Sequence, residues 1–252
     1  MELITVCNRK GGVSKTETCR AFGQGLMQRG YKVLFIDLDG QRNLTYSMRG
    51  GKHPNTIYDV FTDGCRVADA IERTEQGDII SGDTKLYNIA DDKKLTHTFI
   101  SERLSKLTEY DYILIDTAPN RSKLTFSVMV ASDGLIFPVM ADMYAIQSLK
   151  EVYAELEGAR EYNKHLRVYG ICITRYIKSV LARDVITQIK AVAEFMGTDV
   201  YTSPIRECVA VRESVAVGKS LYEYAPKSTS AKDYDAMVSE FQMRYAKVGD
   251  AG

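Results

Sequence analysis

Runs of apolar residues recur along the chain, with segments of helical spacing between them. The runs cover residues 3–6, 33–37, 112–115, 135–139 and 168–173. Strands that are apolar on successive residues are buried on both faces, as in a parallel sheet covered by helices. The pattern therefore predicts an α/β fold with a doubly wound, mainly parallel sheet and helices on both faces. In such folds ligands bind at the carboxyl ends of the strands.

The segment between the first two runs is predicted to form a helix over residues 16–29. Cys19, Phe22 and Leu26 repeat at helical spacing, and Gly30 suits the position that follows a helix end. Strand, helix and strand make one βαβ unit. No linker, repeat or low-complexity tract interrupts the chain, so we expect a single domain over residues 1–252.

Residues 50–110 are the least regular part of the chain. The pattern there predicts a helix near residues 67–72, a strand near residues 86–89 and a helix over residues 96–107. A further helix is expected over residues 122–131.

A glycine-containing turn joins the first strand to the first helix. Its sequence is Lys10-Gly11-Gly12-Val13-Ser14-Lys15-Thr16-Glu17. Backbone N–H groups in such a turn wrap an anion, and the positive end of the following helix adds to the same field. Lys15 would reach the β- and γ-phosphates of a nucleotide, and Thr16 would offer its hydroxyl to Mg²⁺. We therefore predict that residues 10–17 bind a nucleotide, ATP, with Mg²⁺.

The turn departs from the strict pattern G-x-x-x-x-G-K-[ST], because Arg9 and Ser14 stand where its two glycines belong. The strand before it, the helix after it and the Lys-Thr pair still favour a phosphate loop over an ordinary turn with chance lysines. A second lysine, Lys10, precedes the two glycines. With it, the segment resembles the deviant Walker A loop of the ParA/MinD superfamily of ATPases, the Soj-like ParA partition proteins especially.

Two of the predicted strands end in carboxylates, Asp37 with Asp39 on one and Asp116 on the other. Carboxylates beside a phosphate loop can hold metal-bound water and orient an attacking water. The alternative is that these acids cap strands or turns.

Two segments around these acids carry the resemblance further. Residues 36–45 resemble the ParA switch D-x-D-P-Q-G-N-x-T, with Gly40 and Arg42 in place of its proline and its glycine, and residues 111–119 resemble the Walker B strand. The resemblance implies that Asp39 serves hydrolysis and that Asp116 holds Mg²⁺ through water. It implies catalytic roles for Lys10, Lys15 and Asp39, and a metal site of Thr16, Asp39 and Asp116.

The resemblance extends over nearly the whole chain. Thr174 ends a strand where the family often reads the nucleotide base, and Pro204 and Arg206 lie in a segment similar to the I-P-R-N segment near adenine. ParA proteins carry DNA-contacting basic residues in their C-terminal part. By that resemblance the DNA-binding candidates are Arg206, Arg212, Lys219 and Lys227.

Composition narrows the function classes. Thirty-three basic residues balance thirty-three acidic ones, so an anionic partner must be met by a local patch. Five cysteines form no C-x-x-C pair, which argues against a disulfide framework, a structural zinc site and a metallocluster carrier. No stretch nears the ~20 apolar residues of a membrane span, and we expect a cytoplasmic protein that does not bind a membrane.

The same scaffold hosts proteins of different function. A MinD-like membrane-cycling ATPase needs a C-terminal amphipathic helix, and the tail at residues 241–250 looks too short and too weakly amphipathic for one. A small-molecule ATP-dependent synthetase remains the enzyme alternative. The resemblance implies a nucleoid-associated partition ATPase that forms a homodimer with ATP and binds DNA non-specifically. Its hydrolysis would be stimulated by a ParB-like centromere-binding partner.

Overall fold

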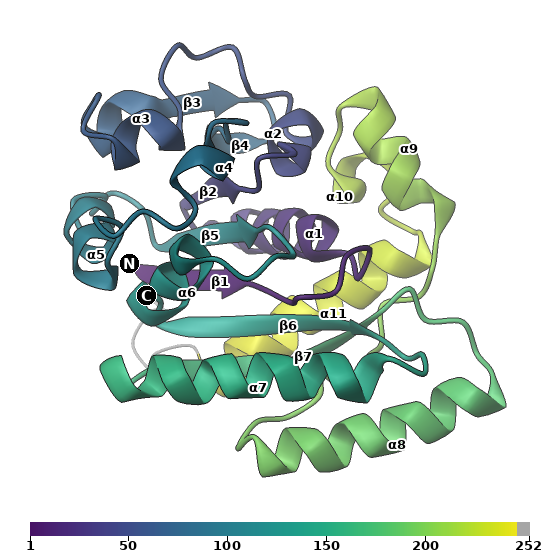
Figure 1. Ribbon diagram of the computed structural model, residues 1–252. Coiled ribbons are helices and arrows are strands. Elements are labelled where there is room, and N and C mark those ends of the chain that lie inside the picture. Colours follow the sequence, from purple (N-terminus) through teal and green to yellow (C-terminus); the bar gives the residue numbers. More distant parts are fainter. Residues whose placement is uncertain (246–252) are drawn as a thin grey trace.

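The computed structural model of the protein describes residues 1–245, and seven strands within them form one sheet (Figure 1). The strand order is β3-β4-β2-β5-β1-β6-β7. The strands are β1 (Glu2–Val6), β2 (Val33–Leu38), β3 (Ile71–Thr74), β4 (Gly77–Ile80), β5 (Tyr112–Thr117), β6 (Gly134–Met140) and β7 (Arg167–Thr174). All neighbours pair in parallel except β3, which is antiparallel to β4. The predicted mainly parallel sheet is confirmed.

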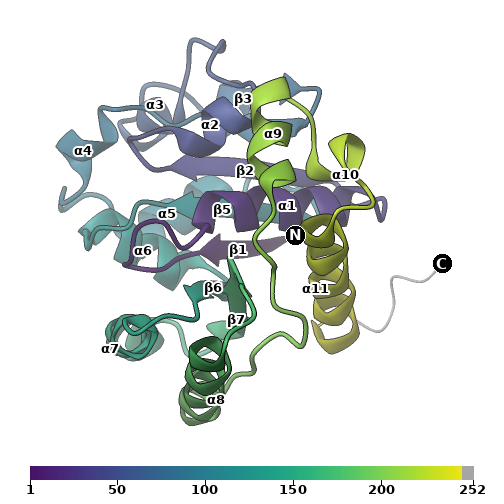
Figure 2. The same ribbon diagram turned by 90° about the vertical axis from the view of Figure 1, so that its right-hand side faces the viewer.

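Helices cover both faces of the sheet (Figure 2). They are α1 (Lys15–Met27), α2 (Asn43–Ser47), α3 (Ile57–Phe61), α4 (Leu86–Ile89), α5 (His97–Leu104), α6 (Lys123–Ala131), α7 (Ala145–Tyr162), α8 (Val180–Phe195), α9 (Val209–Val217), α10 (Leu221–Tyr224) and α11 (Thr229–Tyr245), with a 3₁₀ helix at Val67–Ala70. Helices α1 and α11 lie on one face, and α5 and α6 lie on the other.

Strand β2 illustrates how the apolar runs build this core. Phe35 joins the buried cluster that contains Phe22 of α1 and Phe241 of α11. Its neighbour Ile36 joins a second cluster with Ile100 of α5 and Leu124 of α6. Because successive side chains of a strand point to opposite faces, a strand between two helical layers must be apolar throughout.

The predicted strand near residues 86–89 is wrong. That segment is helix α4, because Leu86 and Ile89, three residues apart, turn to one side and are buried while Tyr87 and Asn88 are exposed. The strand that joins the sheet is β4, earlier in the chain.

The predicted helix near residues 67–72 is correct only at its start. The 3₁₀ helix ends at Ala70, and Glu72 already lies in β3. The carboxylate of Glu72 accepts hydrogen bonds from the backbone N–H groups of Gly51 (2.7 Å) and Lys52 (3.1 Å). A tight turn then leads into β4 at Gly77, whose φ of 122° favours glycine.

Polar side chains fix where the other predicted helices begin. Thr96 and Ser122 accept hydrogen bonds from the N–H groups of Phe99 and Thr125, so α5 and α6 each begin one residue later. At the C-terminus, α11 ends at Tyr245, and residues 246–250 of the tail considered above lie outside the described residues. None of the helices described is long and apolar enough to cross a membrane.

Candidate nucleotide site

The carboxyl ends of three adjacent strands bring the predicted site residues together. In the register of the sheet, Asp116 of β5 lies beside Val6 of β1 on one side and beside Asp37 of β2 on the other. The glycine-containing loop continues from β1 and Asp39 follows Asp37, so all of these groups meet at one edge.

Hydrogen bonds within the loop and to neighbouring segments fix its conformation. Asn8 accepts hydrogen bonds from the N–H of Lys10 (2.9 Å) and the hydroxyl of Ser148 on α7 (2.6 Å). The buried hydroxyl of Thr174 donates to the carbonyl of Val13 (3.0 Å). The ammonium of Lys15 donates to the carbonyl of Lys10 (3.2 Å), so it folds back over the loop that it follows.

Ser14 has a φ of 63° and Arg42 has a φ of 60°, both in the left-handed region that favours glycine. These are the two positions where the resembled motifs carry glycines. The chain therefore keeps the backbone of both motifs with non-glycine residues. Gly40, which stands in place of the switch proline, has another reason, since a Cβ there would lie 2.6 Å from the ring of Tyr87.

Asp116 and Asp39 lie near Lys15, and a third carboxylate, Asp37, lies beside Asp116 in the sheet. Asp116 accepts a hydrogen bond from the hydroxyl of Thr16 (2.6 Å) through Oδ2, while its buried Oδ1 has no partner among the described residues. Asp37 accepts hydrogen bonds from the N–H of Thr45 (2.8 Å), the hydroxyl of Thr45 (2.7 Å) and the N–H of Asp39 (3.0 Å).

Burial and mutual repulsion act on the charges of these groups. Burial, followed by the nearby charge of Asp37, raises the pKa of Asp116 well above its usual range. Burial also raises the pKa of Asp37 to about 6 and lowers the pKa of Lys15. A bound cation would relieve this repulsion, and the unpartnered oxygen of Asp116 beside the hydroxyl of Thr16 fits one.

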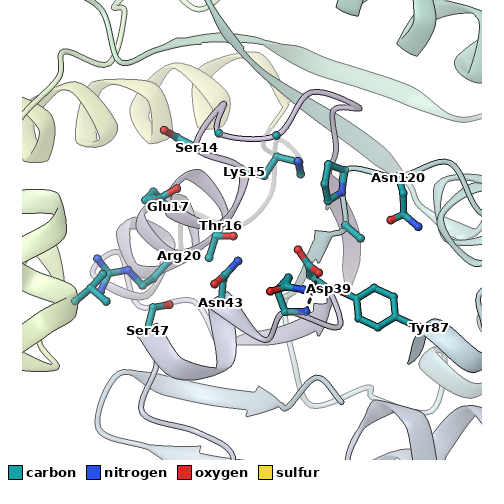
Figure 3. Close-up of a pocket in the computed structure, with 16 residues that line it drawn as sticks. Ser14, Lys15, Thr16, Glu17, Arg20, Asp39, Asn43, Ser47, Tyr87 and Asn120 are labelled. Carbon is teal, nitrogen blue, oxygen red and sulfur yellow. Dashed lines mark hydrogen bonds between the residues drawn. The ribbon is translucent and has the colours of Figure 1, made fainter. Parts of the chain in front are cut away.

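A cavity of about 730 Å³ opens above these groups. Figure 3 shows the side chains of Lys15, Thr16 and Asp39 around one space. Within residues 1–245 no three His, Cys, Asp or Glu side chains are arranged to hold a metal ion alone. Mg²⁺ commonly uses one or two carboxylates together with phosphates and water.

A second cavity, of about 250 Å³, lies on the other side of the loop and shares Gly12, Ser14 and Glu17 with the first. It is also lined by Arg206, whose guanidinium donates to both oxygens of Asp233 (2.9 and 2.6 Å). The position of this second cavity next to the loop suits the base of a nucleotide whose phosphates lie in the first.

The predicted role of Thr174 in this second cavity needs correction. Its hydroxyl is buried against Val13 and supports the loop, while the next residue, Arg175, lines the cavity. Pro204 is half-buried and is followed by Ile205 and Arg206, which line the cavity.

The four predicted DNA contacts differ in their surroundings. Arg206 is paired with Asp233, and Lys219 is paired with Glu223 (2.8 Å). Arg212 of α9 is exposed at the edge of the second cavity, and Lys227 is exposed after α10. The pairing of Arg206 favours a structural role at the second cavity for that residue.

The side chain of Lys10, which follows β1, contacts another segment of the same chain. Its ammonium pairs with Asp142, next to the start of α7, and lies 5.3 Å from the centre of the Tyr144 ring.

Sequence reasoning missed several residues that line the first cavity, among them Arg20, Asn43 and Tyr87. Tyr87 comes from α4 and accepts a hydrogen bond from the amide of Gln41 (2.9 Å). No local sequence signal marks it, because only the fold brings α4 to the switch segment.

The family model described as an AAA domain matches residues 1–168. The sporulation initiation inhibitor protein Soj of Bacillus subtilis is 30% identical over 95% of this chain and 97% of its own length. The chromosome partitioning protein ParA of Caulobacter vibrioides is 29% identical over 95% of this chain and 93% of its own. The chain belongs to the ParA/MinD family of ATPases.

Solved structures outside the partition proteins share the fold of this ParA/MinD-family chain. Cobyrinic acid a,c-diamide synthase of Mycobacterium smegmatis, solved with a bound ATP analogue and magnesium, has a TM-score of 0.81 at 23% identity and covers 98% of this chain and 97% of its own. The cell division ATPase MinD of Pyrococcus furiosus has a TM-score of 0.79 at 25% identity and covers 97% of this chain and 99% of its own. Fold similarity alone therefore does not separate partition from these functions.

Proposed function

We propose that this ATPase is a DNA partition protein. It binds ATP with Mg²⁺, forms a homodimer, and then binds DNA without sequence preference. A ParB-like partner stimulates hydrolysis and so releases the DNA, which makes the protein a nucleoid-associated switch in the cytoplasm. The partition relatives, about 30% identical over nearly the full chain, favour this function over membrane cycling or small-molecule synthesis.

The observation that carries the nucleotide part is the arrangement at the edge of the sheet. Lys15 lies at the end of the loop, and the hydroxyl of Thr16 is bonded to Asp116, whose second oxygen is unpartnered among the described residues. Lys15 binds the phosphates, and Thr16 and Asp116 hold the metal, Asp116 through water. Mg²⁺ supplies positive charge to the phosphate oxygens.

Asp39 supplies the catalytic carboxylate. It borders the first cavity, and its Oδ1 accepts a hydrogen bond from the N–H of Gln41 (2.9 Å), which fixes its direction. A carboxylate held in this way orients a water for attack on the terminal phosphate.

Lys10 completes the site from the partner subunit. In the single chain its ammonium pairs with Asp142, a half-exposed contact that can be exchanged for phosphate when two copies meet. Lysine makes charge-assisted contacts with phosphate as well as with carboxylate, so the exchange replaces one such contact by another.

DNA binding tests the proposal as a whole. Filter binding of two unrelated duplexes, with ATP or ADP and over several salt concentrations, should give equal binding of both duplexes with ATP and weak binding with ADP. Each phosphate contact should add about 0.9 to the log–log salt slope. A strong preference for one duplex, or no DNA binding in either nucleotide, would favour a small-molecule enzyme instead.

A further inference from the structure

Helix α9 lies beside both cavities of the nucleotide site. Val215 lines the first cavity, and Val211 and Arg212 line the second. Within α9 two side chains are buried, Ala210 and Ser214. Because so little apolar surface attaches α9 to the rest of the molecule, its polar contacts contribute much of what fixes its position.

One of these contacts comes from the helix that follows the phosphate loop. Arg20 of α1 is 2% exposed and lies on the far side of Thr16 from Lys15 (Figure 3). Its guanidinium donates to the hydroxyl of Ser214 (2.8 Å) and to the carbonyl of Lys219 (3.3 Å). A third acceptor is the side-chain oxygen of Gln76 (3.4 Å).

These three acceptors are all neutral. A guanidinium taken out of water is costly unless it is hydrogen-bonded, so Arg20 is poorly suited to a merely space-filling role. What its bonds do is join α1 to the C-terminal end of α9.

A second contact comes from the segment that follows the switch. Arg49 lies two residues after α2 and donates to the carbonyl of Ala216 (2.7 Å). Gly218 leaves room for it, since a Cβ there would lie 2.3 Å from Nε of Arg49. The free carbonyls at a helix C-terminus attract cations, which favours this placement.

We propose that Arg20 and Arg49 are positioning residues that couple the nucleotide site to α9. Arg20 belongs to α1, which follows the phosphate loop, and Arg49 follows α2, which continues the switch segment after Asp39; each bonds the C-terminal end of α9 or the residues after it. A shift of either segment on ATP binding is thereby passed to Arg212 on α9 and to Lys219 after it. This inference rests on the proposed function, because DNA contact by those two residues is its output.

The test compares two arginines that hydrogen-bond to different helices, Arg20 in α1 and Arg29 just after α1. Arg20→Met removes the bonds to α9. The matched control is Arg29→Met, because Arg29 follows α1 and donates instead to Asp235 (2.7 Å) and Ser239 (2.7 Å) of α11. Arg20→Met is compatible with folding, since Ser214 also bonds Val211 and Gln76 also bonds Gln24. Ser214→Ala removes the acceptor on α9 and serves as a second variant.

Two readouts are needed. The first is the ratio of DNA affinities in ATP and ADP. With each nucleotide at a saturating concentration, Arg20→Met should lower this ratio at least about fivefold, the lower end of typical coupling effects. The second is amide hydrogen exchange over residues 209–219, which should respond to ATP in the wild type and lose that response in Arg20→Met. Arg29→Met should retain both, and Arg49→Met should resemble Arg20→Met.

The outcomes separate this inference from the proposed function. If wild-type protein binds no DNA, the proposed function fails, and the exchange of α9 alone decides the coupling. Equal exchange of wild-type α9 in ATP and ADP would overturn it. So would an Arg20→Met protein, or a Ser214→Ala protein where Arg20→Met does not fold, that keeps the wild-type ratio and the wild-type exchange response.

Discussion

The two cavities beside the phosphate loop differ in how their charges are matched. In the first, Lys15 bonds a backbone carbonyl, and Thr16 bonds the buried Asp116 next to the cavity, which keeps one oxygen without a partner among the described residues. In the second, Arg206 pairs with Asp233 and Arg175 pairs with Glu207 (3.0 Å). The first cavity thus holds charges that a ligand can complete, whereas two of the three arginines that line the second are already paired with carboxylates of the same chain.

This difference indicates how one ligand fits both. On the proposed function, charged phosphates and Mg²⁺ bind in the first cavity. Burial raises the pKa of Asp37 and Asp116, repulsion by a neighbouring carboxylate adds to each shift, and a bound cation would relieve that repulsion. A neutral ring belongs in the second, where it need not break an ion pair. The comparison therefore predicts that substitutions that remove a charge lower nucleotide affinity at the first cavity. Substitutions that change side-chain size should lower it at the second.

The largest effect is expected from Lys15→Ala. It removes the cation that faces the phosphates, and charge-assisted hydrogen bonds are among the strongest available. Binding of a fluorescent ATP analogue should fall by at least about a hundredfold, which corresponds to ~2.7 kcal/mol. Lys190→Ala, an exposed lysine of α8, is the control and should bind normally. Unchanged affinity in Lys15→Ala would mean that the loop does not bind phosphate.

The second prediction separates the roles of Asp39, which lines the first cavity, and Asp116, which accepts a hydrogen bond from the cavity residue Thr16. Asp39→Ala should keep ATP binding and slow hydrolysis by roughly 10²–10⁴-fold, the usual range for loss of a general base. Asp116→Ala should instead weaken binding itself, and only when Mg²⁺ is present. Equilibrium titrations with Mg²⁺ or EDTA, together with single-turnover hydrolysis, distinguish the two. If both variants lose the same step, the division of roles is wrong.

Local patterns predicted the phosphate side of this comparison well. The loop and the acids at strand ends each follow directly from a strand, so strand order alone brings Lys15, Asp39 and Asp116 to one edge. Ser14 and Arg42 depart from the expected glycines, yet both adopt the left-handed backbone that glycine would favour. The surrounding fold enforces that conformation, and the identities of the two residues do not predict it.

The remaining parts depend on contacts between segments far apart in the chain. Strands β3 and β4 have only four residues each, too few to show a clear apolar pattern, and β3 is the edge strand of the sheet. Leu86 and Ile89 fit a strand by composition and a helix by spacing, and the structure has the helix. Thr174 ends its strand as expected, but its hydroxyl donates a hydrogen bond to the carbonyl of Val13 in the phosphate loop.

A smaller effect tests the base side. Val211→Trp adds a large ring to the second cavity without adding charge, so it should lower ATP affinity roughly tenfold, or ~1.4 kcal/mol. Affinity for inorganic tripolyphosphate, which needs only the first cavity, should stay at the wild-type value. Val217→Trp, at an exposed position of the same helix, is the control. Equal losses for ATP and tripolyphosphate would show that the two cavities are not independent subsites.

The smallest effect is expected at Ser14, one of the three residues that border both cavities. Ser14→Gly should stabilise the protein, because an L-residue in the left-handed region costs about 1–2 kcal/mol and glycine gives back roughly 0.5–1 kcal/mol in chain entropy. The net gain of about 0.5–1 kcal/mol should raise the Tm of a chain of this size by ~1–4 °C. Ser14 makes no side-chain capping bond to α1, so no helix cap is lost. Ser14→Ala removes the same hydroxyl but keeps the Cβ and therefore the strain, and its Tm should not rise. Thermal unfolding of the two variants without nucleotide decides between backbone and hydroxyl, since an equal rise in both would assign the effect to the hydroxyl.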